Sequence, residues 1–297
     1  MLTPPPLKYG SKAALISTAR KVDSSQVKLA VEQFRSWGIE LVAAPNLFSE
    51  FHQFSGTDEE RAADLQWAIN QSEIEAIICF RGGYGTVRII DKIDFSPLLT
   101  RPKWIAGYSD VTVLHARLNT LGVVSIHGSM PVNFPRNTQE AINTLRQALF
   151  GELIEIESSG NSLNRHGIAE GELVGGNLSI IYSLQGSKDA FKTSGKVLFI
   201  EDLDEYLYHI DRMMQNLKRS GVLSSIKGLI VGGMTDMRDN AVPFGKIAEE
   251  IILDAVSEYS YPVCFGFPAG HINDNRAVIF GKKIRLEVSS TSSLTYV

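Results

Sequence analysis

The first half of the chain alternates between short apolar runs and stretches with helical signals, and this alternation restricts the fold most. Strand-like apolar runs occupy residues 12–19, 40–45, 75–80, 103–108 and 123–130. Helices are predicted over 24–38, 57–71, 85–93, 110–122 and 137–151. Strands that alternate with helices form a parallel sheet covered on both faces. We therefore predict an α/β fold with a doubly wound parallel sheet, whose binding sites lie beyond the carboxyl ends of its strands.

The pattern changes after Gly151, where the chain becomes rich in Gly, Ser and Asn and shows only short alternating stretches up to residue 177. Strands are predicted next at 196–203, 226–234 and 262–267, helices at 206–221 and 244–259, and a β-rich tail at 276–290. A length of 297 residues suits two domains. We predict an α/β domain over residues 1–151 and a mixed, β-rich domain over 152–297.

Composition narrows the class of partner. Apolar residues make up 44% and charged residues 21%, and the net charge is −4. This balance argues against nucleic acid or an anionic membrane as the main partner. The first residues, MLTPPPLKYGSK, lack the apolar core of a signal peptide, and no run approaches the ~20 apolar residues that span a bilayer. We expect a cytoplasmic protein.

The two cysteines, Cys79 and Cys264, each lie within an apolar strand-like run. Such cysteines are typically buried, reduced thiols. The spacing of the cysteines and histidines fits neither a disulfide framework nor a metal site, so no metal is predicted.

The sequence IAGYSD places Ser109 where a buried strand turns into a helix. One interpretation is a helix cap, supplied by Ser109 or Asp110. The other is a nucleophile at a strand end, with a helix N-terminus behind it. The motif lacks the second glycine of G-x-S-x-G, so the chain is not an ordinary α/β-hydrolase.

A second turn, CFRGGYG at 79–85, also joins a strand to a helix. Its backbone N–H groups could bind an anion, either a phosphate or an oxyanion. The alternative is a tight turn that needs glycine for its positive φ. The pattern matches neither G-x-G-x-x-G nor a Walker loop.

A serine nucleophile needs a base and an acid that orients it. Among the histidines, His271 has the best context, a loop rich in Gly and Pro after a strand. His127 follows a strand near the same kind of edge, whereas His115 and His209 lie within predicted helices. The packing or solvated alternative stays open for each of them.

The acids lie in FIEDLDEY, at a strand end and helix start. They either interact with the positive end of the helix dipole or supply the carboxylate that orients a histidine. Glu201 comes directly out of the apolar strand and should be placed most rigidly; Asp202, Asp204 and Glu205 follow it.

Taken together, these motifs resemble a family of serine peptidases. They are FRGGYG (80–85), GYSD (107–110), GGN (175–177), FIEDLDEYLYHIDRMM (199–214) and FPAGH (267–271). In this order and spacing, over nearly the whole chain, they resemble the LD-carboxypeptidase family. The resemblance implies a triad of Ser109, Glu201 and His271, assembled across a cleft between the domains. It places the oxyanion donors on the backbone N–H groups of Gly83 and Asp110.

The resemblance also implies a fold and a reaction. Members have an N-terminal domain similar to class I glutamine amidotransferases and a β-rich C-terminal domain, commonly form homodimers and need no metal or cofactor. The implied reaction removes the terminal D-alanine from a murein tetrapeptide in peptidoglycan recycling. A microcin-type branch cleaves peptidyl or aminoacyl nucleotides instead, and this remains the alternative. Candidate substrate-binding residues are Arg81, Gly82, His127, Asn177 and Glu205, with Arg212 as a further cation.

Two other classes compete with this hypothesis. A non-catalytic binding module would hold a phosphate on the glycine-rich turn and would not need Glu201 and His271. An amidotransferase-like enzyme would need a cysteine at the strand–helix corner, which Ser109 occupies instead.

Overall fold

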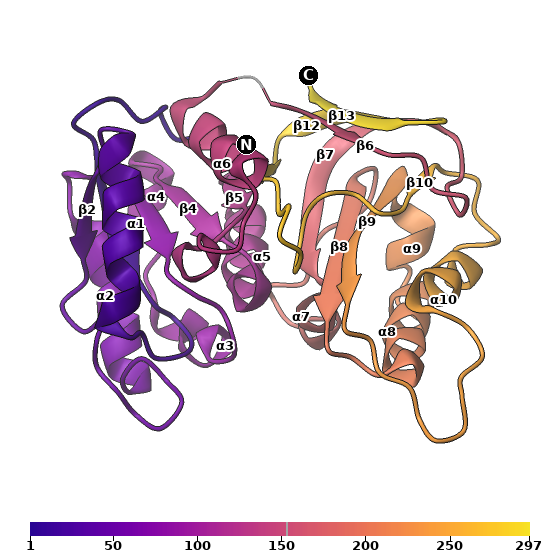
Figure 1. Ribbon diagram of the computed structural model, residues 1–297, viewed down its shortest axis with the longest axis horizontal. Helices are drawn as coiled ribbons and strands as arrows, with labels where there is room; N and C mark the ends of the chain where they lie inside the picture. The colour runs from indigo at the N-terminus through magenta and orange to yellow at the C-terminus, as the bar shows by residue number, and fades with distance from the viewer. Residues whose placement is uncertain (153) are drawn as a thin grey trace. The chain divides into compact units, whose positions relative to one another are not determined.

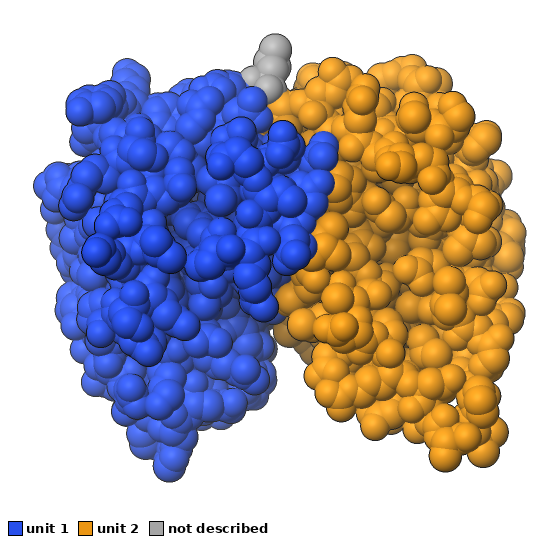
Figure 2. All heavy atoms as spheres, viewed as in Figure 1, with its two compact units in different colours: residues 1–153, 273–279 blue, residues 154–272, 280–297 orange. Residues whose placement is uncertain are grey.

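The computed structural model describes residues 1–152 and 154–297. The chain divides into two compact units, coloured separately in Figure 2. Unit 1 comprises Met1–Leu153 and Asn273–Ile279, and unit 2 comprises Ile154–Ile272 and Phe280–Val297. The short segment 273–279 thus leaves the second half of the sequence to join unit 1. The sequence pattern assigns all of residues 152–297 to the second domain, whereas the structure groups 273–279 with unit 1.

Unit 1 is built on a six-stranded sheet (Figure 1). Its strands are β1 Lys12–Ile16, β2 Glu40–Ala43, β3 Ile74–Cys79, β4 Trp104–Gly107, β5 Ser125–His127 and β11 Val278–Phe280, in the order β11-β5-β4-β3-β1-β2. The pairings β2/β1, β1/β3, β3/β4 and β4/β5 are all parallel. The carboxyl ends of β3 and β4, adjacent in the sheet, carry the two motif-bearing turns to one edge.

Helices and short 3₁₀ turns connect these strands. They are α1 Ser24–Ser36, α2 Asp58–Asn70, α3 Thr86–Ile89, η1 Ile90–Lys92, α4 Pro97–Thr100, η2 Ser109–Val111, α5 Thr112–Leu121, η3 Pro131–Asn133 and α6 Gln139–Phe150. The longer helices begin at residues that cap them: Asp23 for α1, Thr57 for α2 and Thr138 for α6. Thr57 and Glu60 form a complete capping box. The predicted single helix over 85–93 is a four-residue helix followed by a 3₁₀ turn.

Unit 2 contains a seven-stranded mixed sheet in the order β10-β9-β8-β7-β12-β13-β6. Its strands are β6 Glu155–Ser158, β7 Gly167–Asn177, β8 Val197–Leu203, β9 Gly228–Thr235, β10 Val263–Cys264, β12 Lys283–Val288 and β13 Ser292–Tyr296. The pairings from β10 to β7 are parallel, and those from β7 to β6 are antiparallel. The eleven-residue β7 therefore joins a parallel half to an antiparallel half.

Four helices belong to unit 2: α7 Leu178–Ser183, α8 Leu207–Arg219, α9 Val222–Ser225 and α10 Ala248–Ala255. Helix α8 buries Ile210, Met213, Met214 and Leu217 along one stripe and contacts α7, α9 and α10. The α/β fold, with a mixed and β-rich second half, is thereby confirmed. Over residues 1–152 and 154–297, no helix is long and apolar enough to cross a bilayer.

Candidate active site

Ser109 occupies a strained corner at the carboxyl end of β4. Its φ is +64°, a left-handed value that L-residues with a side chain seldom adopt. Such a conformation costs about 1–3 kcal/mol and persists where the surroundings enforce it. Tyr108 before it is extended, and η2 begins at Ser109 itself. The serine is therefore the turning point between strand and helix, as in the nucleophile elbow of α/β-hydrolases.

Two consecutive glycines lie against this corner. A Cβ on Gly82 would lie 3.0 Å from Oγ of Ser109 and 2.9 Å from its Cβ. Gly83 has a φ of +124°, and a Cβ there would lie 2.6 Å from Cγ of Arg20. The turn after β3 needs glycine at both places, because a larger residue would displace either the serine or the arginine.

Asp110 joins the two turns from inside the fold. Its carboxylate is buried, with 1% of the residue exposed, and accepts a hydrogen bond of 2.8 Å from the backbone N–H of Thr86. Burial raises the pKa of Asp110, against the lowering effect of its hydrogen bonds with Thr86. The Thr86 hydroxyl in turn lies 2.7 Å from the hydroxyl of Thr18, which follows β1. The start of α3 is thereby tied to the residue that follows Ser109.

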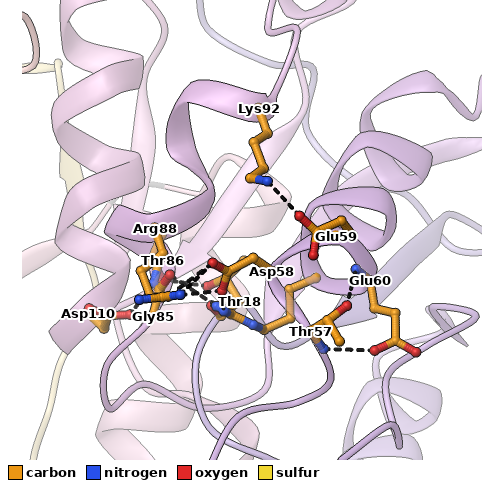
Figure 3. A network of polar contacts seen from close by, with 11 residues as sticks. Thr18, Thr57, Asp58, Glu59, Glu60, Gly85, Thr86, Arg88, Lys92 and Asp110 are labelled. Atoms are coloured by element: carbon orange, nitrogen blue, oxygen red, sulfur yellow. Dashed lines mark hydrogen bonds and ion pairs between the residues drawn. The ribbon is translucent and has the colours of Figure 1, made fainter. Parts of the chain in front are cut away.

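A buried arginine of α2 supports the same turn; Gly85, Thr86 and Asp110 are labelled in Figure 3. Arg61 is fully buried, and its Nη1 donates to the carbonyl oxygens of Gly85 at 3.0 Å and Thr18 at 2.5 Å. Its charge is balanced by Asp58, which also accepts from Arg88 at 2.8 Å. Arg61 thus fixes the backbone at Gly85, one residue before the Thr86 N–H that holds Asp110.

A carboxylate–histidine pair joins β8 to the loop after β10 in unit 2. Nδ1 of His271 lies 2.6 Å from Oε2 of Glu201, and the backbone N–H of His271 donates to the same oxygen at 3.2 Å. The Glu201 side chain is fully buried, and that of His271 is 12% exposed. Burial alone would lower the pKa of His271, but the charge and hydrogen bond of Glu201 outweigh it and raise the pKa. This arrangement fixes the ring and assigns its proton to Nδ1.

The PAGH loop can approach Glu201 because of Gly270. Its φ is +104°, and a Cβ there would lie 2.7 Å from Cβ and 2.8 Å from Oε2 of Glu201. On the other side of the loop, the Thr235 hydroxyl donates to the His271 carbonyl at 2.9 Å. The loop is therefore held from β9 while it closes over the end of β8.

Asn177 and Asp202 form a second polar group beside this pair. Asp202 accepts hydrogen bonds from the Asn177 amide at 2.8 Å, from the Ser179 N–H at 2.8 Å and from the Leu203 N–H at 2.9 Å. Burial, together with the neighbouring Glu201 charge, raises the pKa of Asp202 to about 7. Asn177 also caps α7. The predicted substrate-binding residue Asn177 thus has a clear structural task at the end of β7.

The remaining predicted residues lie in varied surroundings. Glu205 contacts His209 at 2.5 Å, and Arg212 lies over the ring of exposed Tyr208. His127 is fully buried, with its ring centroid 5.8 Å from that of Tyr108.

Two residues that the sequence pattern does not assign to the site, His115 and Cys79, are buried in the structure. His115 is fully buried between the Ser125 hydroxyl and the Gly107 carbonyl, and burial lowers its pKa to about 3. Cys79 is buried in β3, where burial raises its pKa to about 12. Neither can serve as base or nucleophile near neutral pH. In the described parts of the chain, His, Cys, Asp and Glu form no group of three or more that could hold a metal ion.

Comparison with known proteins places the chain in a family. The model described as "LD-carboxypeptidase N-terminal domain" matches residues 13–128, and that described as "LD-carboxypeptidase C-terminal domain" matches residues 170–286. A Bacillus subtilis protein, "Probable murein peptide carboxypeptidase", is 32% identical over 98% of this chain and 93% of its own. The chain belongs to the LD-carboxypeptidase family. It is therefore a hydrolase, a carboxypeptidase of the serine type.

Solved structures agree with this assignment. A muramoyltetrapeptide carboxypeptidase from Oxalobacter formigenes superimposes with a TM-score of 0.89 at 27% identity, covering 96% of this chain and 98% of that one. MccF in complex with glutamyl sulfamoyl guanosine gives a TM-score of 0.88 at 20% identity, covering 99% and 98%. The second likeness shows a shared fold.

The close approach at Gly270 predicts a specific sensitivity. We expect Gly270→Ala in this LD-carboxypeptidase to lower the free energy of unfolding by about 1–3 kcal/mol and to reduce turnover, because the new Cβ would displace the Glu201 carboxylate. Gly266→Ala is the matched control, since its φ is also positive but its nearest neighbour lies 3.6 Å from the new Cβ. Thermal unfolding and peptide hydrolysis check both variants, and equal turnover in the two would contradict the explanation.

The Arg61 network predicts a positioning effect. We expect Arg61→Lys to lower kcat by up to about 100-fold with little change in KM. The single Nζ of lysine cannot replace both Nη1, which donates to the two carbonyls, and Nη2, which pairs with Asp58. A shift of the turn should cost less than the complete loss of a backbone oxyanion donor, which is about 10²–10³-fold. Arg88→Lys is the control, because Arg88 pairs with the same Asp58 but is 47% exposed. Steady-state kinetics, with thermal unfolding to account for lost stability, separate the two, and a native kcat in the Arg61→Lys variant would refute the role.

Proposed function

We propose that the chain removes the terminal D-alanine from a murein tetrapeptide, using Ser109 as nucleophile, His271 as base and Glu201 as the orienting acid. The observation that carries this proposal is the hydrogen bond of 2.6 Å between Glu201 and Nδ1 of His271. It leaves Nε2 as the atom that would take a proton from serine, the arrangement of a Ser-His-acid triad. The strained corner at Ser109 supports the choice of nucleophile.

The proposed reaction follows from these groups. Oγ of Ser109 attacks the carbonyl carbon of the L–D peptide bond while its proton passes to Nε2 of His271. The carbon–nitrogen bond then breaks, and the imidazolium returns the proton to the amine of the departing D-alanine. Water, deprotonated by the same histidine, attacks the acyl carbon. The ester bond to Oγ then breaks, Oγ of Ser109 takes the proton back from the imidazolium, and the shortened peptide leaves. Glu201 stabilises the imidazolium in both steps.

The oxyanion would be stabilised by the backbone N–H groups of Gly83 and Asp110. Both follow strand ends of the parallel sheet in unit 1, and Asp110 is held by the hydrogen bond between its carboxylate and the Thr86 N–H. Donors fixed before the reaction stabilise the developing charge without reorganisation. The strained φ of Ser109 and the positive φ of Gly83 are consistent with a backbone shaped for this purpose.

The choice of substrate rests on relatives. The names of the Bacillus subtilis and Oxalobacter formigenes proteins refer to murein peptide and muramoyltetrapeptide. The MccF complex holds an aminoacyl nucleotide analogue, so cleavage of peptidyl or aminoacyl nucleotides is the second candidate. We further propose a homodimer that acts in the cytoplasm; light scattering after gel filtration and cell fractionation would test these two properties.

The nucleophile is tested by Ser109→Ala. We expect the wild type to release one alanine from murein tetrapeptide and the variant to lose at least about 10³-fold in turnover while folding normally. Mass spectrometry of the product and circular dichroism check the two points. Turnover of an aminoacyl nucleotide, but not of tetrapeptide, would shift the substrate to the second candidate; full activity in the Ser109→Ala variant would refute the nucleophile.

The role of Glu201 as the orienting carboxylate is tested by a pH profile. His271 must be neutral to accept a proton, so kcat/KM should rise with pH through a pKa above the ordinary 6.5. Glu201→Gln removes the charge that stabilises the imidazolium. We expect its acidic limb to move to lower pH and its plateau to fall by about 10³–10⁴-fold. An unmoved limb in the Glu201→Gln variant would exclude Glu201 as the partner of the titrating base.

A further inference from the structure

A cationic side chain lies directly over the turn proposed to hold the oxyanion. A Cβ on Gly83 would lie 2.6, 2.7 and 2.9 Å from Cγ, Cδ and Nε of Arg20. The preceding Gly82 makes the equivalent approach to Oγ of Ser109. Arg20 and Ser109 are therefore next to consecutive residues of the same short turn, and both belong to unit 1.

A second arginine accompanies the first. The charge of Arg20 lowers the pKa of Arg81, after the larger effect of burial. Nη1 of Arg81 donates to the Lys21 carbonyl at 3.1 Å. Over residues 1–152 and 154–297, no ion pair joins either guanidinium to a carboxylate. Two neighbouring guanidinium groups without a balancing carboxylate repel each other, an arrangement that an incoming anion would stabilise.

Lys21, the residue after Arg20, does have a carboxylate partner. Nζ of Lys21 lies 2.8 Å from Oε2 of Glu50 and is half exposed. Lys21, Glu50 and Arg81 line a polar pocket of about 470 Å³. The positive charge that remains without a partner around this turn therefore comes from Arg20 and Arg81.

We propose that Arg20, together with Arg81, binds the terminal carboxylate of the peptide substrate and so restricts the enzyme to the last residue of the chain. The inference rests on the proposed function. In a carboxypeptidase substrate, only one carbon atom separates the scissile nitrogen from the terminal carboxylate. A cation that recognises this carboxylate must therefore lie close to the nucleophile and the oxyanion donors, as Arg20 does beside Gly83.

Guanidinium suits this task because its planar fork matches a carboxylate and stays charged at all physiological pH values. Arg20 is solvent-exposed, so substrate can reach it. If Arg20 instead stabilised the oxyanion directly, its removal would lower kcat/KM by the same factor for every substrate, whether the peptide ends in a carboxylate or a carboxamide.

The experiment compares two peptides and three variants. The substrates are the murein tetrapeptide with a free terminal carboxylate and the same peptide as its terminal carboxamide. The variants are Arg20→Gln, Arg20→Lys and the control Lys21→Gln, which removes the same charge from the next residue. Values of kcat/KM and thermal unfolding temperatures are measured for each.

We expect the wild type to prefer the acid. Arg20→Gln should lower kcat/KM for the acid by about 10- to 100-fold, the effect of losing a hydrogen bond between charged groups, and should change the amide rate less than about 3-fold. Arg20→Lys should recover part of the preference, and Lys21→Gln should retain it.

Other outcomes overturn the inference. If Arg20→Gln lowered kcat/KM equally for both peptides, Arg20 would stabilise the oxyanion or have a structural role. If the variant kept the preference for the acid, Arg20 would not be the residue that binds the terminal carboxylate. In both cases the wild type still cleaves the acid, so the proposed function survives. Failure of the wild type to cleave either peptide would refute the proposed function and this inference with it.

Discussion

Close approach of backbone to side chain, which glycine alone permits at these positions, organises both parts of the candidate site. In unit 1, Gly82 lies against Ser109, and in unit 2, Gly270 lies against Glu201. Each contact would be shorter than 3.1 Å if a Cβ were added, so the neighbouring functional side chain would have to move. The two glycines are far apart in sequence, but each lets the backbone approach a functional side chain that a larger residue would keep at a distance.

Such crowding requires rigid support, and the structure supplies it with buried polar groups. Ser109 is held in a left-handed conformation next to Asp110, whose carboxylate is anchored at Thr86. Arg61 fixes the carbonyl of the preceding Gly85. A buried guanidinium is costly unless its donors are satisfied. The pairing of Nη1 with two carbonyl groups and of Nη2 with Asp58 offsets part of that cost, whereas the buried Nε has no hydrogen-bond partner among the described residues.

Local sequence patterns predicted many of the strands and helices, and the features that they missed have physical causes. The alternation of apolar runs and amphipathic helices predicted the parallel sheet, because burial on both faces dictates composition. The long strand β7 was not predicted, since its run of glycines and alternating charges obscures the strand period. Arg61 was missed because a charge on a helix looks solvated, whereas its hydrogen bonds reach Thr18 and Gly85, distant in sequence. Arg20 escaped notice for the same reason: its position over Gly83 depends on the packing of β1 beside β3.

The choice between adjacent carboxylates shows how the surroundings assign separate tasks to similar groups. Glu201 and Asp202 follow each other in β8, where successive side chains point to opposite faces. Asp202 is saturated by the Asn177 amide and two backbone N–H groups, which makes it a structural acceptor. Burial and the charge of Glu201 raise the pKa of Asp202 to about 7, against the lowering effect of these hydrogen bonds. The His271 ring hydrogen-bonds to Glu201, and the glycine loop that carries the histidine fixes the geometry of this contact.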